Sequence, residues 1–242
     1  YARTQATGYG AVYFLEAMLE ADDENLDGKE CLISGAGNVA LFAAEKLIQS
    51  GAKVLTVSDS DGTLYAADGF SATQMDRIKT LKFENYGRLH EFEDEATEYL
   101  DGKTPWEIAA DIAMPSAIQN DIGLADAKAL KQNGLKYVVE GANMPLTVDA
   151  TEYFQDHDLI IAPGKAANAG GVAVSQFEMA QNAQKFSWDF ERVDKDLKTL
   201  MHRIHDRCRN AGKTDNGKTN YIRGANVAAF KRVAEAMADQ LA

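Results

Sequence analysis

The sequence predicts an α/β fold built on a doubly wound, mostly parallel sheet, with additional helices at its C-terminal end. Short apolar runs alternate with stretches of helical period, which is typical of a parallel sheet covered by helices on both faces. The alternation occurs twice, before and after a weakly patterned, acidic stretch at residues 85–106. We therefore expect two βαβαβ halves within one domain of residues 1–242.

The first half contains clear stop signals between its elements. Gly51 follows a helical pattern directly, and glycine enters the left-handed conformation at a helix end without a Cβ penalty. Residues 59–70 are rich in Asp and Gly, which predicts a small hairpin. In order, we expect a helix over residues 7–20, an acidic turn over 21–28, a strand over 30–34, a helix over 38–49, a strand over 53–58 and a helix over 71–83.

The second half repeats the alternation and then becomes helical. We expect a strand over residues 110–113, a helix over 124–132, a strand over 136–140, a helix over 148–155 and a strand over 159–162. Further helices are expected over 167–185, 190–209 and 226–241, with a turn-rich break at 210–220. Three helices at one end suggest that residues 187–242 pack back toward a domain that this chain lacks.

Composition and charge argue against several classes of protein. The net charge is −12, and a surface poor in Lys and Arg does not attract nucleic acid. No apolar run approaches the roughly 20 residues needed to span a bilayer, and no signal segment opens the chain. Cys31 and Cys208 lie far apart, and Cys31 sits in an apolar run. Buried, inert thiols are expected, which fits a reducing, cytoplasmic compartment.

The clearest chemical signal is a glycine turn between the first predicted strand and the next helix. The turn reads Ser34-Gly35-Ala36-Gly37-Asn38-Val39-Ala40. Gly35 permits a tight turn, Gly37 lets the backbone approach a pyrophosphate, and Ala40 allows close packing of helix on strand. The second strand ends near the acidic Asp59 and Asp61, at about the spacing of the group that contacts a cofactor ribose. Together these features predict a Rossmann-type dinucleotide-binding fold.

Two readings of the nicotinamide cofactor remain open from the residues alone. Asp59 and Asp61 favour NAD, because a carboxylate accepts hydrogen bonds from the ribose 2′-hydroxyl and repels a 2′-phosphate. Ser58 and Ser60 can instead donate to a phosphate. A set of basic residues that could fold back onto that phosphate follows shortly afterwards: Arg77, Lys79, Lys82 and Arg88. A solvated helix face is the alternative reading of these four.

Several segments spread over the whole chain resemble the hexameric glutamate dehydrogenases of the amino-acid dehydrogenase superfamily. They are RTQATGYG at residues 3–10, the glycine turn at 34–40, QN at 119–120, EGANMP at 140–145, PGKAANAGGV at 163–172 and GAN at 224–226. The resemblance implies reversible oxidative deamination of L-glutamate to 2-oxoglutarate and ammonia, with hydride transfer to NADP or NAD.

The resemblance also implies that this chain is only the coenzyme-binding part of such an enzyme. The family's catalytic lysine and aspartate belong to an N-terminal domain, so no catalytic residue is expected in this chain. The first residue is Tyr1, and a helical pattern starts almost at once, which suggests a fragment. We expect the fragment to bind cofactor without turnover and to be monomeric or weakly associated, and the intact enzyme to be a homohexamer.

Matching positions assign candidate binding residues along the chain. The resemblance places Gly35, Gly37, Asn38 and Val39 at the pyrophosphate, Thr7 and Asn168 at the nicotinamide carboxamide, Asn143 at its ribose, and Gln119 and Asn120 at a strand end beside the cofactor. It places Ser58, Asp59 and Ser60, with Lys82 and Arg88, at the adenosine ribose, where they resemble NADP-preferring bacterial members. Where the family usually has Thr this chain has Ile118, which removes one hydroxyl from the site.

Two further positions match the family's contacts to the substrate. Val172 is expected to pack on the aliphatic stem of glutamate, and Ser175 to reach its side-chain carboxylate. The alternative readings are a buried apolar residue and a helix-stabilising hydroxyl. Ser175 favours glutamate over the apolar substrates of leucine, phenylalanine or valine dehydrogenases, because only glutamate offers a side-chain carboxylate.

Other features of the sequence are interpreted as structural. His202 and His205 have a spacing compatible with metal binding, but no further ligands accompany them, so a charged helix surface is expected and no metal site is predicted. Trp106 and Trp188 are expected to anchor the core. A non-catalytic nucleotide-sensing module remains an alternative function, and an S-adenosylmethionine methyltransferase is disfavoured by the second motif around Gly141 and Asn143.

Overall fold

The computed structural model describes residues 3–185, 187–215 and 217–241, and they form the predicted α/β architecture. The first half comprises α1 (Ala6–Ala21), β1 (Glu30–Ser34), α2 (Asn38–Gln49), β2 (Lys53–Ser58), β3 (Gly62–Tyr65), α3 (Ala72–Phe83), the short 3₁₀ turn η1 (Leu89–Glu91) and β4 (Glu98–Asp101). The second comprises η2 (Pro105–Glu107), β5 (Ile112–Pro115), α4 (Leu124–Gln132), β6 (Tyr137–Val139), α5 (Val148–Asp156), β7 (Ile160–Ala162), α6 (Gly164–Ala167), α7 (Gly170–Gln184), α8 (Phe190–Gly212) and α9 (Tyr221–Leu241).

The sheet has seven strands in the order β4-β3-β2-β1-β5-β6-β7. Strands β2, β1, β5, β6 and β7 run parallel, and β3 and β4 add an antiparallel edge. The chain leaves β1 toward β2 on one side and later returns to β5 on the other, so the order reverses between β1 and β5. In open α/β sheets, ligands bind beyond the carboxyl ends of the strands at such a switch point.

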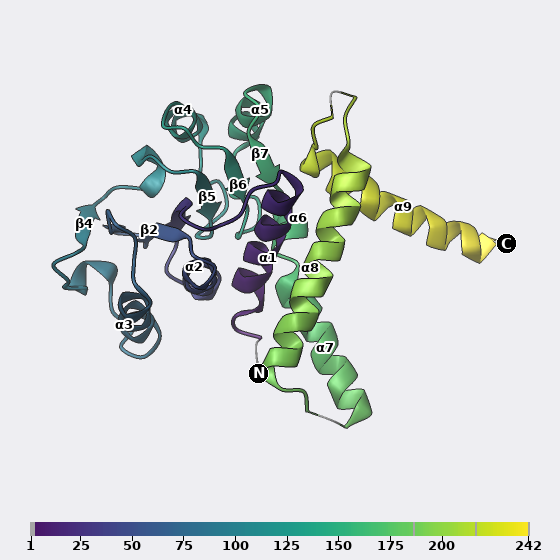
Figure 1. Ribbon diagram of the computed structural model, residues 1–242, viewed down its shortest axis with the longest axis horizontal. Coiled ribbons are helices and arrows are strands. Elements are labelled where there is room, and N and C mark those ends of the chain that lie inside the picture. The colour runs from purple at the N-terminus through teal and green to yellow at the C-terminus, as the bar shows by residue number, and fades with distance from the viewer. Residues whose placement is uncertain (1–2, 186, 216, 242) are drawn as a thin grey trace.

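Two hydrophobic clusters cover the two faces of the sheet, as Figure 1 shows. Helices α2 and α3 cover one face, and the opposite face carries α4 and α5. Trp106 lies fully buried in the second cluster, and its indole nitrogen donates to the Asp121 carbonyl at 3.2 Å. The prediction that Trp106 anchors the core is confirmed. Trp188 is only partly buried and stacks under the Arg192 guanidinium.

The fold differs from the sequence prediction mainly at its edges. The predicted hairpin exists, but its first strand is β2 itself, which pairs with β3. Strand β4 lies in the stretch without a clear pattern, because an edge strand exposed to solvent needs no apolar alternation. The predicted helix over residues 167–185 corresponds to α7, which starts three residues later, and the short helix α6 before it was not predicted. Helix α9 begins at Tyr221, five residues earlier than the predicted start at Asn226.

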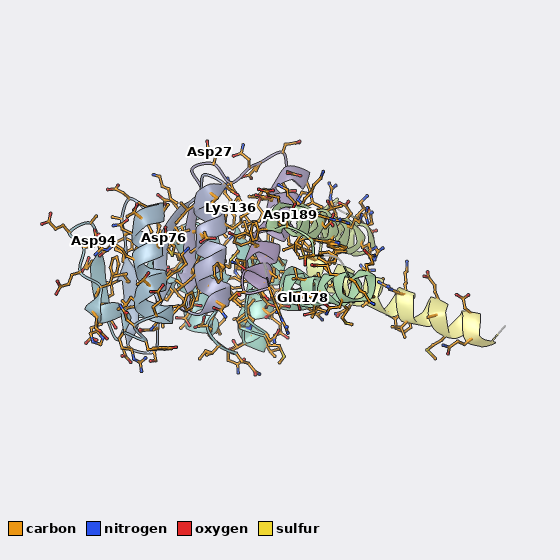
Figure 2. The ribbon with its side chains drawn as sticks, turned by 90° about the horizontal axis from the view of Figure 1, so that it is seen from below. Asp27, Asp76, Asp94, Lys136, Glu178 and Asp189 are labelled. Carbon is orange, nitrogen blue, oxygen red and sulfur yellow. The ribbon has the colours of Figure 1, made fainter. Side chains whose placement is uncertain are left out.

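The C-terminal helices separate into a packed part and a projecting part. Helix α8 packs on α1 and α7, and the Tyr13 hydroxyl donates to Asp194 at 2.6 Å. Both views show the later turns of α9 extending away from the body (Figures 1 and 2). Phe230, Val233 and Met237 are exposed there. That residues 187–242 pack toward another domain stays a prediction.

The interpretation of His205 as part of a charged helix surface is wrong. His205 is only 2% exposed, and its Nε2 lies 2.9 Å from the Tyr221 hydroxyl of α9. Its ring also packs edge-on against Phe14 of α1. The sequence pattern of α8 alone could not show this, because the cover comes from two other helices.

Acidification is expected to destabilise this junction of α1, α8 and α9. Burial lowers the pKa of His205 from its ordinary value of 6.5, and the nearby Asp206 carboxylate only partly opposes the shift. A group with a depressed folded-state pKa contributes its full stability above the unfolded value and loses it as the pH falls through the folded value. Urea unfolding at about pH 7.5 and pH 5 should show a loss of roughly 1 kcal/mol for the wild type that is absent in His205→Gln. An identical loss in the variant would contradict this assignment.

Candidate functional site

The glycine turn after β1 is hydrogen-bonded to the last residue of β2. Gly35 has a φ of +91°, a conformation that favours glycine. Its amide donates to the Ser58 hydroxyl at 3.0 Å, and a Cβ on Gly35 would lie 3.1 Å from the Ser116 carbonyl oxygen. Ser58 is therefore buried beneath the turn and supports its shape, whereas the sequence placed this hydroxyl at the cofactor phosphate.

Gly37 differs from Gly35 because the protein itself does not require a glycine there. It caps α2 in an extended conformation, with φ −95° and ψ −171°, which any residue can adopt. A Cβ on Gly37 would meet no described atom within 4 Å. Gly37 and Asn38 are exposed at the N-terminus of the helix, where unpaired backbone amides favour an anion.

A cluster of polar side chains forms beyond the end of β2, and it includes two of the four basic residues considered from the sequence. Arg88 donates to the Ser60 hydroxyl at 2.8 Å and lies 3.7 Å from Asp61. Lys82 donates to the Gly87 carbonyl at 2.7 Å and lies 3.5 Å from the Asp59 carboxylate. We refer to Ser60, Lys82 and Arg88 as the basic corner.

The other two basic residues are engaged elsewhere. Arg77 donates to the Asp94 carboxylate at 2.6 Å and to the Glu93 carbonyl at 2.7 Å. Lys79 bonds Glu45 and lies 2.8 Å from Asp76. The reading as a solvated helix face fits Arg77, whose side chain is 50% exposed. It does not fit Lys79, whose side chain is only 18% exposed and links α3 to Glu45 of α2.

The Asp59 carboxylate is already hydrogen-bonded to backbone amides of the protein. It is 8% exposed and accepts from the amides of Leu89 at 3.0 Å and Asp61 at 3.1 Å. Burial acts to raise the pKa of Asp59, but these hydrogen bonds and Lys82 outweigh it, so the pKa is lowered. The ionised carboxylate thus organises the loop, and little of it remains to accept from a ribose hydroxyl.

The loops after β6 and β7 bring two predicted amide side chains together. The Asn168 amide nitrogen donates to the Asn143 side-chain oxygen at 2.7 Å. Thr7 lies on α1 against the start of α7, since a Cβ on Gly171 would be 2.6 Å from its hydroxyl. These three side chains can offer both donors and acceptors, which suits a neutral carboxamide.

The loop after β5 contributes exposed side chains next to this pair. Gln119, Asn120 and Ile118 are all exposed. Asn120 has a φ of +56°, and its amide donates to the Met144 carbonyl at 3.0 Å. This bond ties the loop after β5 to the loop after β6, where Asn143 lies.

The two predicted substrate residues lie on one helix but differ in availability. Val172 is 68% exposed, so it is not the buried apolar residue of the alternative reading. The Ser175 hydroxyl donates to the Gly171 carbonyl one turn earlier, at 3.1 Å. This is the helix-stabilising bond considered as the alternative for Ser175, and the hydroxyl must rotate before it can donate to a substrate.

Sequence reasoning missed two carboxylates at the strand ends. The Ser34 hydroxyl bonds the Asp121 carboxylate and accepts from the Ser116 amide at 3.0 Å, which joins the ends of β1 and β5. Burial raises the pKa of Asp121. The Glu140 carboxylate accepts from the Gly164 amide at 2.6 Å. The only available signal was an acidic residue directly after, or close to, the end of a predicted strand.

Within the described residues, no three His, Cys, Asp or Glu side chains are grouped to hold a metal ion. None of the helices in this described part of the chain combines the length and apolar character required to cross a bilayer. Cys31 and Cys208 are both free and buried, and burial raises the pKa of Cys208 to about 11.

Comparisons with known proteins agree over nearly the whole chain. The NADP-specific glutamate dehydrogenase of Psychrobacter sp. (strain TAD1) is 52% identical over 97% of this chain and 53% of its own length. The glutamate dehydrogenase of Bacteroides thetaiotaomicron is 48% identical over 98% of this chain and 54% of its own length. The crystal structure of Plasmodium falciparum glutamate dehydrogenase has a TM-score of 0.96 at 42% identity, covering 99% of this chain and 52% of that one.

This chain thus spans about half the length of the relatives it matches. The family model described as Glutamate/Leucine/Phenylalanine/Valine dehydrogenase matches residues 1–240. The chain belongs to the glutamate, leucine, phenylalanine and valine dehydrogenase family.

Proposed function

We propose that this chain is the NADP-binding part of a glutamate dehydrogenase, an oxidoreductase that interconverts L-glutamate with 2-oxoglutarate and ammonia. The observation that carries the proposal is the basic corner of Ser60, Lys82 and Arg88. It lies beyond the carboxyl end of β2, next to the glycine turn at the carboxyl end of the neighbouring strand β1. A 2′-phosphate requires positive charge and donors at that point. The Asn143 and Asn168 pair stands at the other side of the switch point, where the nicotinamide would lie.

The protein residues fit the proposed cofactor in three ways. Gly37 leaves room for a pyrophosphate at the helix N-terminus. Arg88 is half-exposed and can reach a phosphate. The Asp59 carboxylate already accepts hydrogen bonds from backbone amides, so it is a poor acceptor for a ribose hydroxyl. Relatives named NADP-specific include the Psychrobacter and Escherichia coli enzymes, and the Xylanibacter ruminicola relative is named NAD(P)-specific. NADP is therefore the proposed cofactor, with NAD as a second one that a dual-specific enzyme would accept.

In this proposal the chain binds and orients the cofactor and contributes one wall of the substrate site. The nicotinamide supplies the chemistry, since it accepts or returns the hydride of the substrate α-carbon. Asn143, Asn168 and Thr7 fix its carboxamide and ribose, and Val172 offers an apolar surface to the substrate stem. The catalytic lysine and aspartate lie outside these residues, so we expect the chain alone to bind cofactor without turnover.

The assembly proposed for the enzyme follows from the resemblance to the family, and the proposed location rests on the two free, buried cysteines of this chain. We propose a cytoplasmic homohexamer for the intact enzyme and a monomeric or weakly associated state for this chain. L-Glutamate is favoured over leucine, phenylalanine or valine by the names of the relatives and by Ser175. The bond from Ser175 to Gly171 makes that residue the weaker of the two arguments.

The proposal is tested by titrating the chain with NADPH and separately with NADH, at fixed ionic strength because the phosphate contact is charge-dependent. NADPH is expected to bind at least about tenfold more tightly, since charge-assisted bonds to the 2′-phosphate contribute on the order of 1.5–3 kcal/mol. Equal or tighter binding of NADH would reject the NADP assignment. If cofactor binds, but no amino acid is oxidised when the chain is part of a full-length protein, a non-catalytic binding module becomes the better reading.

A further inference from the structure

Glu140 connects the loops after β6 and β7 through both its main chain and its side chain. Its backbone amide donates to the Ala162 carbonyl at the end of β7, at 3.1 Å. Its carboxylate accepts from the Gly164 amide at 2.6 Å. One residue therefore determines how far the start of α6 lies from the end of β6.

The contacts continue from Glu140 to the amide pair of the site. A Cβ on Gly164 would lie 3.3 Å from the Glu140 carboxylate and 3.4 Å from the Asn168 side-chain nitrogen, so Gly164 sits closely between them. The Asn168 backbone amide donates to the Gly164 carbonyl at 2.8 Å. The Asn168 side chain then donates to Asn143 at 2.7 Å. Moving Gly164 would move Asn168 with it.

The Glu140 carboxylate is partly buried. Burial raises the pKa of Glu140, and the Gly164 amide and Lys165 act in the opposite direction. Burying an ionised carboxylate costs free energy unless its bonds compensate. The bond to Gly164 is short and charge-assisted, so it compensates this cost and fixes the position of Gly164 relative to Glu140.

We propose that Glu140 is a positioning residue, which acts through Gly164 to hold Asn143 and Asn168 in the arrangement that receives the nicotinamide. The inference rests on the proposed cofactor function and adds a residue to it. Glu140 does not itself contact the cofactor in this proposal. Its effect should therefore be confined to the nicotinamide end and spare the glycine turn and the basic corner.

Calorimetric titration with two ligands separates the two ends of the site. NADPH engages both ends, whereas 2′-phospho-ADP lacks both the nicotinamide and the ribose that carries it. Glu140→Ala is expected to weaken NADPH binding about tenfold, the value of one charge-assisted bond, and to leave the binding of 2′-phospho-ADP within about twofold. Glu140→Gln keeps an oxygen acceptor for Gly164, so it should restore NADPH binding to within about twofold of the wild type.

Asp126→Ala is the matched control, because it also removes a carboxylate that accepts from a glycine amide, that of Gly123 at 2.9 Å, at the start of α4. It should leave the binding of both ligands unchanged. Equal weakening of both ligands by Glu140→Ala, or a Glu140→Gln variant as weak as Glu140→Ala, would overturn the positioning role while the cofactor function stands. If the wild type binds neither ligand, the proposed function fails and this inference fails with it.

Discussion

Gly37→Val is expected to weaken binding of NADPH and NADH by at least about 100-fold while the domain stays folded. A Cβ at Gly37 would meet no described atom within 4 Å, so the fold leaves open space where a valine side chain begins. It occupies the space through which a pyrophosphate must approach the α2 amides. Losing two charge-assisted bonds of about 1.5–3 kcal/mol each accounts for the expected loss of binding. Fluorescence titration measures the affinity, and urea unfolding measures the stability.

Gly123→Val is the matched control for the stability that Gly37→Val loses by placing valine at a helix N-cap. Gly123 caps α4 in nearly the same conformation as Gly37 caps α2, with φ −92° and ψ −179°. Both variants should lose no more than about 1 kcal/mol of unfolding free energy, and only Gly37→Val should lose binding. Gly35→Ala should differ from Gly37→Val by destabilising the fold itself, by about 1–2 kcal/mol, because the φ of +91° at Gly35 strains any other residue. Normal binding by Gly37→Val would place the pyrophosphate elsewhere.

The difference between these two glycines shows which parts of the site the sequence could predict. The turn is local: strand, Gly35, Gly37 and helix are consecutive, and each requirement acts within a few residues. The pairing of Asn143 with Asn168 joins residues of two different loops, and only the positions of β6 and β7 in the sheet bring them together. The resemblance named both residues, but no pattern could show that they touch.

Residues whose surroundings come from other elements were the ones misread. Ser58 was expected at the cofactor because its hydroxyl can donate to a phosphate and its segment resembles that of NADP-preferring members, yet in the structure this hydroxyl accepts from the Gly35 amide on the neighbouring strand end. His205 was read as part of a charged surface, although α1 and α9 cover it. Strand β4 has a mostly polar sequence and is defined by its pairing with β3. In each case the deciding contact is between residues distant in the sequence.

Arg88→Ala is expected to raise the dissociation constant for NADPH about tenfold or more and to change that for NADH less than about twofold. The Arg88 side chain is 51% exposed and already points at Ser60, so a 2′-phosphate there gains a donor without rearrangement of the fold. One charge-assisted bond to phosphate accounts for this effect. The NADPH affinity of the wild type should also depend more steeply on salt than that of the variant.

Arg77→Ala removes the same charge from a side chain of similar exposure, 50%, that is bonded to Asp94. It should leave the preference for NADPH over NADH unchanged, which separates a specific contact from a general loss of positive charge. Lys82→Ala is a less selective test, because Lys82 also holds the Gly87 carbonyl and therefore the loop that carries Arg88. If Arg88→Ala and Arg77→Ala shift the two affinities alike, the basic corner does not read the 2′-phosphate. Because Asp59 is held by backbone amides, losing Arg88 alone should abolish NADPH preference without creating a preference for NADH.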